Sequence, residues 1–363
     1  MYLLIHSIFL SPLSLSQTAA LLYPWVKMPN NVSCDFKDDF KYTLYSSVFS
    51  LVFILGLLLN MVALYIFTRT LQQWNETTIY MMNLVVSDTL FVLSLPFRIY
   101  YFVNQTWPFG HTLCKISVSL FYTNLYGSIL FLTCICADRF LAIVYPFASR
   151  SLRTKRKAKM ACCGIWIIVL SGSFSVGFKI NISDSTANRS FCFEKYSNQQ
   201  WKSELSKVVV FMEMVGFVIP LLINLFCSIM IIKTLRHPTG SNHEGQFNKT
   251  KILRMIVAHL LIFCFCFVPY NINLVFYTLV RSQTITNCTT ERIVKSLYPV
   301  SFCITVTNCC FDPVVYYFTS ETIQNTIRRK SNAVRSGIKH WDVPGSSVCK
   351  SLRTKFLSDE STL

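Results

Sequence analysis

Ionisable residues that border or interrupt long apolar segments are the clearest candidates for function in this sequence. Asp138 and Arg139 end one such segment, Asp312 and Tyr316 end the last, and Asp88 lies inside another. A charged group near a hydrocarbon layer is costly unless it pairs, lines a cavity or serves a switch. These positions therefore favour a protein that switches between states and signals across a membrane.

The elements that must position these residues are predicted to be membrane-spanning helices. The chain has 363 residues, of which 52% are hydrophobic and only 14% charged, a balance far more apolar than that of a soluble domain. Unpaired backbone polar groups are not tolerated in lipid, and we find no short alternating segments typical of a barrel. The predicted fold is an all-α bundle of seven spans, at 43–68, 77–102, 113–145, 160–180, 204–235, 251–281 and 293–318.

The seven-span domain, 43–318, follows an N-terminal arm that covers 1–42. Within the arm, 1–27 contain an apolar stretch with no basic region before it. A cleaved signal peptide and an upstream extension therefore both stay open, and Met28 is an alternative start of the working protein.

The segment after the last span is expected to lie on the membrane surface. Residues 319–331 place apolar and basic side chains at helical spacing, which predicts a short amphipathic helix. In the cytoplasmic tail, 332–363, Cys349 is a candidate for palmitoylation. The final residues, 361–363, fit a ligand for a PDZ protein, although so short a pattern often occurs by chance.

The formal net charge of +17 is concentrated after the third, fifth and seventh spans. By the positive-inside rule these loops face the cytoplasm, so the N-terminus is predicted outside a plasma membrane. A basic cytoplasmic rim explains the charge without nucleic-acid binding, which we do not expect. Glycosylation is predicted at the sequons that fall on the outer side, Asn31, Asn104, Asn181, Asn188 and Asn287.

Four of the fifteen cysteines fall on the predicted outer side, where the environment is oxidising. Cys114 and Cys192 are one natural disulfide pair, and Cys34 and Cys288 are the other. The remaining cysteines are expected to stay reduced, and no Cys/His spacing is typical of a zinc site.

Other functional classes find little support. The sequence has no H-E-x-x-H, no G-x-S-x-G and no Gly-rich phosphate loop, so an enzyme is not expected. A transporter would show broken helices or internal repeats. Transport stays open as an alternative, which a measured flux of substrate would reveal.

An ordered series of residues carries a resemblance to a known family. From 40 to about 330 the chain resembles rhodopsin-family (class A) G protein-coupled receptors. The series is Asn60, Asn83-Leu84, Asp88, Trp107-Pro108-Phe109-Gly110 before Cys114, Asp138-Arg139-Phe140, Trp166, Pro220, Cys266-Phe267-Val268-Pro269 and Asp312-Pro313-Val314-Val315-Tyr316.

The resemblance implies three groups of functional residues. One is the switch that G proteins read, in which Arg139 pairs with Asp138 at rest; its members are Asp138, Arg139, Asp312, Pro313 and Tyr316. The second is an allosteric sodium site of oxygen donors, the only cofactor expected; its members are Asp88, Asn124, Ser128, Asn308 and Asp312. The third repacks between states and comprises Phe263, Phe267 and Pro269.

Prolines are expected to act as pivots in three spans, at Pro220, Pro269 and Pro313. Two positions depart from the family pattern. Phe267 stands where the family usually has tryptophan, and Ser228 where it usually has tyrosine. The detailed mechanics of activation are therefore less well defined by the resemblance.

The outer half of the chain resembles the purinoceptor-like branch of the family. Amine receptors carry an aspartate at the position of Phe121. Nucleotide receptors of the branch carry cations at the positions of Asn271, Leu274 and Phe302. The missing cations disfavour a triphosphate, but basic residues are predicted around the mouth of the bundle: Lys41, Arg98, Arg281, Arg292 and Lys295.

One anionic headgroup with an apolar tail fits this distribution best. Stretches at 40–45, 152–156 and 265–271 are similar to lysophosphatidic acid receptors. The resemblance implies a lysophosphatidic acid-like lipid as ligand, heterotrimeric G proteins linked to Rho, and arrestin as a further partner. A nucleotide or another lysophospholipid is the alternative ligand.

Overall fold

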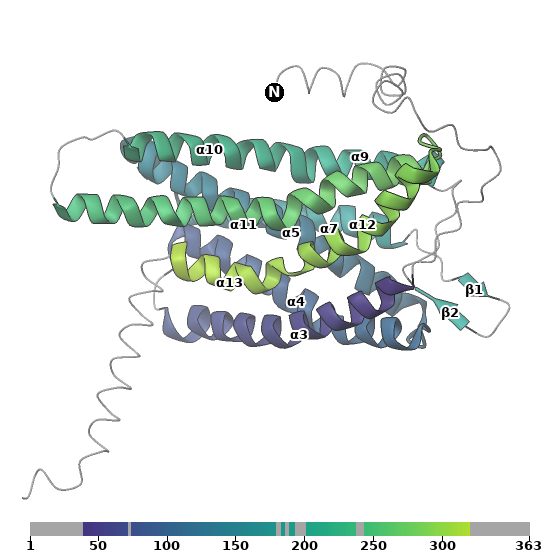
Figure 1. The fold of residues 1–363 in the computed structure, drawn as a ribbon. Helices are drawn as coiled ribbons and strands as arrows, with labels where there is room; N and C mark the ends of the chain where they lie inside the picture. Colours follow the sequence, from purple (N-terminus) through teal and green to yellow (C-terminus); the bar gives the residue numbers. More distant parts are fainter. Residues whose placement is uncertain are drawn as a thin grey trace, which may run out of the picture. The chain divides into compact units, whose positions relative to one another are not determined.

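The computed structural model describes residues 39–71, 74–178, 183–185, 189–192, 201–236 and 243–319. Its long helices run side by side along one axis (Figure 1). Most of the predicted N-terminal arm, the amphipathic segment at 319–331 apart from its first residue, and the tail with Cys349 lie outside the described residues. The predictions made for those segments therefore stay predictions.

Seven helical segments of the described chain are long and apolar enough to cross a membrane. This confirms the predicted bundle, with most ends shifted by only a few residues. The helices are α3 (Phe40–Tyr65, extended by a π-helical turn Ile66–Thr70), α4 (Glu76–Asn104), α5 (Gly110–Val144), α7 (Lys155–Phe178), α9 (Ser206–Glu213) with α10 (Ile219–Arg236), α11 (His243–Arg281), and α12 (Cys288–Val306) with α13 (Asn308–Thr319).

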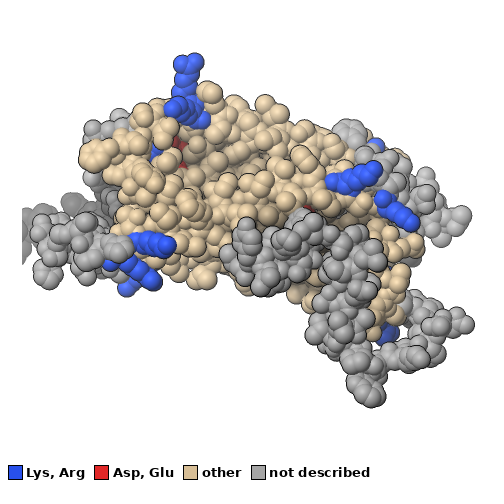
Figure 2. Space-filling model, turned by 90° about the horizontal axis from the view of Figure 1, so that it is seen from above, with Lys and Arg blue, Asp and Glu red and all other residues tan. Residues whose placement is uncertain are grey.

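The bundle is apolar on its outside and partly polar inside. Leu51, Ile54 and Val103 each have more than half of their surface exposed, whereas Asn60 and Asp88 are fully buried. Figure 2 shows Lys and Arg toward the two ends of one face, with a broad middle formed mainly by other residues. This distribution suits a protein surrounded by lipid along its middle and by water at its ends.

Buried side chains join the helices through hydrogen bonds. The indole Nε1 of Trp166 on α7 donates to Asn83 Oδ1 on α4 at 2.8 Å. Asn224 Nδ2 on α10 donates to Thr133 Oγ1 on α5 at 2.6 Å. Because lipid tails are as apolar as the helix faces, polar contacts and close packing hold such a bundle together.

The seventh span divides at Thr307, between α12 and α13, rather than at the predicted pivot Pro313. A tight turn explains the break, because Thr307 N donates to Ile304 O, three residues back. Pro313 has no N–H to donate to Cys309 O. Asn60 Nδ2 on α3 donates to that carbonyl instead, at 2.8 Å. The proline therefore leaves Cys309 O available for a hydrogen bond between helices.

The other two predicted pivots differ from each other. A π-helical turn, Met214–Val218, ends just before Pro220, where the proline ring would crowd the preceding turn of a regular helix. Helix α11 continues through Pro269. The fifth span is therefore irregular at its proline, whereas the sixth keeps its helical course.

Two short elements lie in the connections. Helix α6, Pro146–Leu152, follows α5. Strands β1 (Ser183–Ser185) and β2 (Arg189–Phe191) form an antiparallel hairpin with Asp184 opposite Ser190, and β2 leads directly to Cys192. This hairpin is not predictable from the sequence, because strands of three residues carry too little periodicity to be recognised.

Candidate functional site

Arg98 lies inside the bundle, deeper than the rim to which the sequence analysis assigned it. It is 3% exposed and precedes the end of α4, Asn104, by six residues, or about 9 Å of helix. Its Nη2 donates to Ser117 O on α5 at 2.7 Å, and its Cζ lies 5.5 Å from the centroid of the Phe121 ring. A side chain that only reaches toward water from a helix end would be exposed, so Arg98 has another role.

Aromatic side chains from four helices surround this guanidinium, and we call them the aromatic cage. Its members are Tyr45 on α3, Phe121 and Tyr122 on α5, Tyr270 on α11, and Tyr298 and Phe302 on α12.

The cage is closely packed and electrostatically coupled to Arg98. The rings of Phe121 and Phe302 lie 4.6 Å apart, and those of Tyr270 and Tyr298 lie 5.9 Å apart. The four tyrosines interact electrostatically with the guanidinium. A buried cation bordered by phenol groups, which can donate hydrogen bonds, is suited to an anion. The sequence analysis had singled out only Phe121 and Phe302 among these residues.

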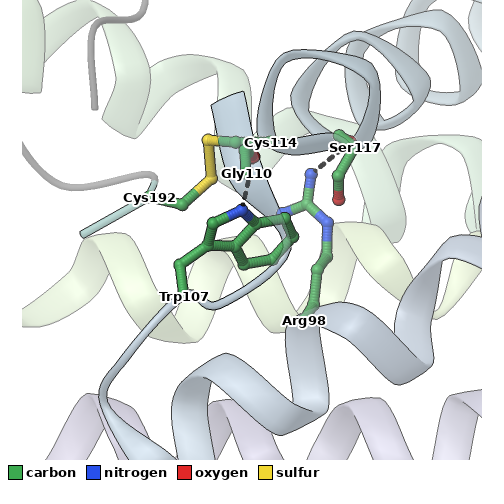
Figure 3. The surroundings of a disulfide bond; sticks show 6 residues. All are labelled: Arg98, Trp107, Gly110, Cys114, Ser117 and Cys192. Carbon is green, nitrogen blue, oxygen red and sulfur yellow. Dashed lines mark hydrogen bonds between the residues drawn. A yellow bond between two sulfur atoms is a disulfide. The ribbon is translucent and has the colours of Figure 1, made fainter. Parts of the chain in front are cut away.

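Three successive turns of α5 organise the neighbourhood of Arg98 (Figure 3). Trp107 Nε1 donates to Gly110 O at 2.9 Å, Cys114 is disulfide-bonded to Cys192, and Ser117 O accepts from Arg98. The predicted Cys114–Cys192 pair is thus confirmed. The disulfide fixes the loop that contains β1 and β2 to the first turns of α5, next to the buried cation.

The second predicted disulfide is described at one partner only. Cys288 is disulfide-bonded. Cys34 lies outside the described residues, so the Cys34–Cys288 pairing stays a prediction.

Removal of the Cys114–Cys192 disulfide is expected to impair folding. Loss of a native disulfide costs about 2–5 kcal/mol, and this bond closes a long loop with a separation of 78 residues. Cys114→Ser and Cys192→Ser should therefore lower surface expression and melting temperature to a similar extent. Cys163→Ser is the control, because Cys163 is an exposed free thiol. Normal expression of both disulfide variants would contradict the expectation.

The other predicted cations lie near the helix ends on the same side of the bundle. Lys41 lies near the start of α3, with its Nζ 5.1 Å from the centroid of the Tyr42 ring. Arg281 is the last residue of α11 and is half-buried, whereas Arg292 is exposed. Lys295 forms an ion pair with Glu291 at 2.7 Å, which the sequence analysis did not anticipate. The cations therefore form an outer level above the deeper Arg98.

The five residues of the predicted sodium site all lie buried in the middle of the bundle. Asn124 Nδ2 donates to Asp88 Oδ1 at 2.7 Å. Both carboxylate oxygens of Asp312 are buried without an N–H or O–H donor from the described residues, and Asp88 lies close enough to interact with them. The Ser128 hydroxyl and the Asn308 amide nitrogen are likewise buried without a partner in the described chain. Two adjacent buried carboxylates require a proton or a cation, so the residues fit a small hard cation.

At the opposite end of the bundle, the partners of Asp138 come from the neighbouring loop and α4. Arg153 Nε donates to Asp138 Oδ1 at 2.6 Å, and Thr77 Oγ1 donates to Oδ2 at 2.6 Å. The carboxylate that accepts these bonds raises the pKa of the Arg153 guanidinium. The predicted pairing of Asp138 with Arg139 stays a prediction. In the sequence analysis Arg153 was only one of several basic residues of its loop.

The two phenylalanines that are predicted to repack between states lie next to each other on the buried side of α11. The rings of Phe263 and Phe267 are both fully buried, with centroids 5.2 Å apart. Tyr316 lies on α13, where its side chain is outside the described part of the structure. Its predicted place in the switch therefore stays a prediction.

Among the predicted glycosylation sites, Asn104 and Asn287 are exposed. Asn287 caps α12 through its side-chain oxygen, which accepts from Thr289 N at 2.9 Å. Asn31, Asn181 and Asn188 lie outside the described residues. The occupancy of all five sites stays a prediction.

These features agree with a comparison with known protein families. They are the seven spans, the Cys114–Cys192 disulfide near one end of the bundle, and the ion pair of Asp138 with Arg153 at the other end. Residues 59–316 match the 7 transmembrane receptor (rhodopsin family). The chain belongs to this family. It is therefore a plasma-membrane receptor that signals through heterotrimeric G proteins, and it is not an enzyme.

Individual relatives agree with the resemblance seen in the sequence. The receptor is 54% identical to human lysophosphatidic acid receptor 6 over 339 residues, which cover 92% of this chain and 98% of the relative. It is 51% identical to human lysophosphatidic acid receptor 4 over 298 residues, 82% of this chain and 80% of the relative. The mouse putative P2Y purinoceptor 10 is 36% identical over 297 residues, 81% of this chain and 89% of the relative.

Proposed function

We propose that this receptor responds to a lysophospholipid, most favourably lysophosphatidic acid, and activates heterotrimeric G proteins linked to Rho. The observation that carries the proposal is the buried guanidinium of Arg98 inside the aromatic cage. A ligand for that position needs an anionic group, which guanidinium and phenol groups recognise together. The relatives named lysophosphatidic acid receptors 6 and 4 support the choice of phosphate and lipid.

The charge at the centre of the site is opposite to that of an amine receptor. Phe121 stands where amine receptors have an aspartate, and Arg98 lies over its ring. An ammonium group placed there would be repelled by the guanidinium and would find no carboxylate at position 121. The site therefore selects for a negative headgroup.

A nucleotide triphosphate fits the same site less well than a single phosphate. Asn271 is buried and donates its Nδ2 to Phe267 O at 2.8 Å, while Leu274 and Phe302 are buried apolar residues. These are the positions at which nucleotide receptors of the branch carry cations. One deep cation and an outer level of cations can neutralise one headgroup, and an apolar tail suits the surrounding helix faces.

A ligand panel on cells that express the receptor tests the proposal. Oleoyl lysophosphatidic acid should activate Rho-linked signalling, while sphingosine phosphate, lysophosphatidylserine and nucleoside triphosphates should be weaker or inactive. Monoacylglycerol is the matched control, because it lacks only the phosphate. A response to nucleotides alone would overturn the ligand and leave the family unchanged.

We infer that the end of the bundle with the Cys114–Cys192 disulfide faces the outside of the cell. A disulfide persists in an oxidising compartment. The basic residues 155–157 lie at the other end, at the start of α7, where the positive-inside rule places the cytoplasm. Arrestin is a further expected partner of that cytoplasmic surface.

We also propose that sodium binds between Asp88 and Asp312 and stabilises the inactive receptor. The cation would supply the positive charge that two adjacent buried carboxylates need. Asp88→Asn should therefore abolish the effect of sodium chloride on agonist affinity. The measurement is a binding isotherm for labelled oleoyl lysophosphatidic acid in sodium chloride and, at equal ionic strength, in choline chloride. Unchanged sodium dependence in the variant would reject the site.

A further inference from the structure

Glu213 is a buried acidic residue of the fifth span that the proposed phosphate site does not use. It is the last residue of α9 and is only 5% exposed. Its Oε1 is buried and accepts no hydrogen bond from the described residues. An ionisable group inside a membrane span is costly and calls for a partner. A ligand that enters the bundle can supply the hydrogen bond that this oxygen lacks.

The side chain of Glu213 belongs to the inward face of the fifth span. Val210 and Phe211, just before it, are 60% and 61% exposed and face the lipid. Gly216 and Phe217, three and four residues after it, are buried. Residues three and four apart share one side of a helix. Glu213 therefore lies on the side of the span that faces the other helices.

Two stacked tyrosines connect the surroundings of Glu213 with those of Arg98. Tyr122, a member of the aromatic cage, interacts electrostatically with Arg98. Tyr126 follows one turn later on α5, and the two rings are stacked with centroids 6.4 Å apart. Tyr126 interacts electrostatically with Glu213. Its ring lies against Gly216, where an added Cβ would be only 2.5 Å from it. The carboxyl group thus lies about one helical turn from the level of the buried cation.

We propose that Glu213 binds the free hydroxyl group of the lysophospholipid while Arg98 binds its phosphate. The inference rests on the proposed ligand and adds a second recognition element to the same site. In lysophosphatidic acid the hydroxyl is on the carbon next to the one that carries the phosphate ester. The distance from that hydroxyl to the phosphate is similar to one helical turn, about 5.4 Å.

A hydroxyl group suits this position better than the other polar groups of a lipid. A carboxyl oxygen accepts a hydrogen bond from an O–H group whether or not the carboxyl is ionised. A phosphate oxygen is a poor partner, because it would be repelled by a carboxylate. An ammonium group is a poor partner as well, because the guanidinium of Arg98 would repel it. The neutral hydroxyl avoids both repulsions.

The contact would select a lipid with one acyl chain over a lipid with two. A diacyl phosphatidic acid carries an ester where lysophosphatidic acid has the hydroxyl, and an ester has no hydrogen to donate. A buried acceptor that stays unpaired in a complex costs affinity. Glu213 is therefore expected to favour the lysophospholipid through its free hydroxyl as well as through its shape.

The ligand-free receptor should be more stable without this carboxyl group. Replacing a buried polar group that lacks a partner with an apolar side chain of similar size is neutral or stabilising. The melting temperature of ligand-free Glu213→Leu should therefore equal or exceed that of the wild type. A carboxyl group that held the helices together would have the opposite effect.

The test compares oleoyl lysophosphatidic acid with its 2-deoxy analogue, which lacks only the hydroxyl. The concentration for half-maximal Rho-linked signalling is measured for the wild type, Glu213→Leu and Glu213→Gln. In the wild type the analogue should be weaker by about tenfold, the effect of one buried hydrogen bond. In Glu213→Leu both lipids should be equally weak. Glu213→Gln keeps an acceptor oxygen and should restore most of the difference.

Phe211→Leu is the control, because it changes a lipid-facing side chain of the same helix. It should keep the wild-type difference between the two lipids. A tenfold difference that persisted in Glu213→Leu would overturn the contact with the hydroxyl. A lower melting temperature of ligand-free Glu213→Leu would make Glu213 a structural residue instead.

Two further results have separate meanings. If sphingosine phosphate is the stronger agonist of the wild type and loses its potency in Glu213→Gln, the partner of Glu213 is an ammonium group and the hydroxyl contact is wrong. If the wild type responds to neither lysophosphatidic acid nor its analogue, the proposed ligand itself fails, and this inference fails with it. A wild type that responds to both lipids leaves the proposed ligand standing, whatever the variants of Glu213 show.

Discussion

Replacing Arg98 with lysine is expected to raise the concentration of lysophosphatidic acid needed for half-maximal signalling by about 100-fold. Disrupting a buried hydrogen-bonded charge pair costs about 2–5 kcal/mol, which corresponds to a factor of thirty or more. Arg98 is buried, lies over Phe121 and donates its Nη2 to Ser117 O, and a planar guanidinium can meet a phosphate with two parallel N–H groups. Lysine keeps the charge but loses the stacking and the fork.

Arg98→Ala should weaken the response further, and two controls separate ligand recognition from folding. Arg292→Ala removes an exposed cation from the outer level and should change potency only slightly. Surface expression and melting temperature of the Lys variant should stay near those of the wild type. Full potency of Arg98→Lys would show that Arg98 does not grip the phosphate, whatever the outcome at Arg292.

The seven spans could be predicted because their physical cause is local. Each needs only a run of apolar residues long enough to cross a bilayer, and no knowledge of neighbouring helices. The disulfide between Cys114 and Cys192 could be predicted for a related reason, since the predicted topology alone places both cysteines on the oxidising side. The break of the seventh span at Thr307 could not be predicted, because no proline marks it and only the bond from Thr307 N to Ile304 O reveals the turn. The hydrogen bond from Asn60 to Cys309 O could not be predicted either, because it joins helices that are far apart in sequence.

The depth of Arg98 and the partner of Asp138 also lay beyond the sequence. Distance from a helix end does not tell whether a side chain points to lipid or to the interior, and packing against Phe121 decides this for Arg98. For Asp138, the adjacent Arg139 is the obvious partner in sequence. The fold also brings Arg153 back to Asp138 across a turn and a short helix, and this contact shows only in three dimensions.

Arg139→Ala is expected to abolish ligand-stimulated nucleotide exchange while leaving lipid binding measurable. Arg139 lies near the end of α5 opposite the headgroup site and is half-buried beside Asp138. It is 22 residues, or about six helical turns, from Ser117, so it cannot touch the headgroup directly. Its guanidinium is permanently charged and long enough to enter a cleft that opens between the helices. Alanine removes both the charge and the reach.

Loss of nucleotide exchange with retained lipid binding is the result that would assign Arg139 to the G-protein cleft. Arg236→Ala is the matched control, because it removes an exposed cation from the last residue of α10 and should reduce exchange only modestly. Labelled lysophosphatidic acid should bind to Arg139→Ala at the cell surface with an affinity within a few-fold of wild type, since Arg98 and the aromatic cage are unchanged. Loss of lipid binding together with nucleotide exchange in Arg139→Ala would indicate a folding defect. A second variant, Arg139→Lys, then decides the question. If it signals at the wild-type rate, the proposed role of Arg139 in the G-protein cleft is wrong.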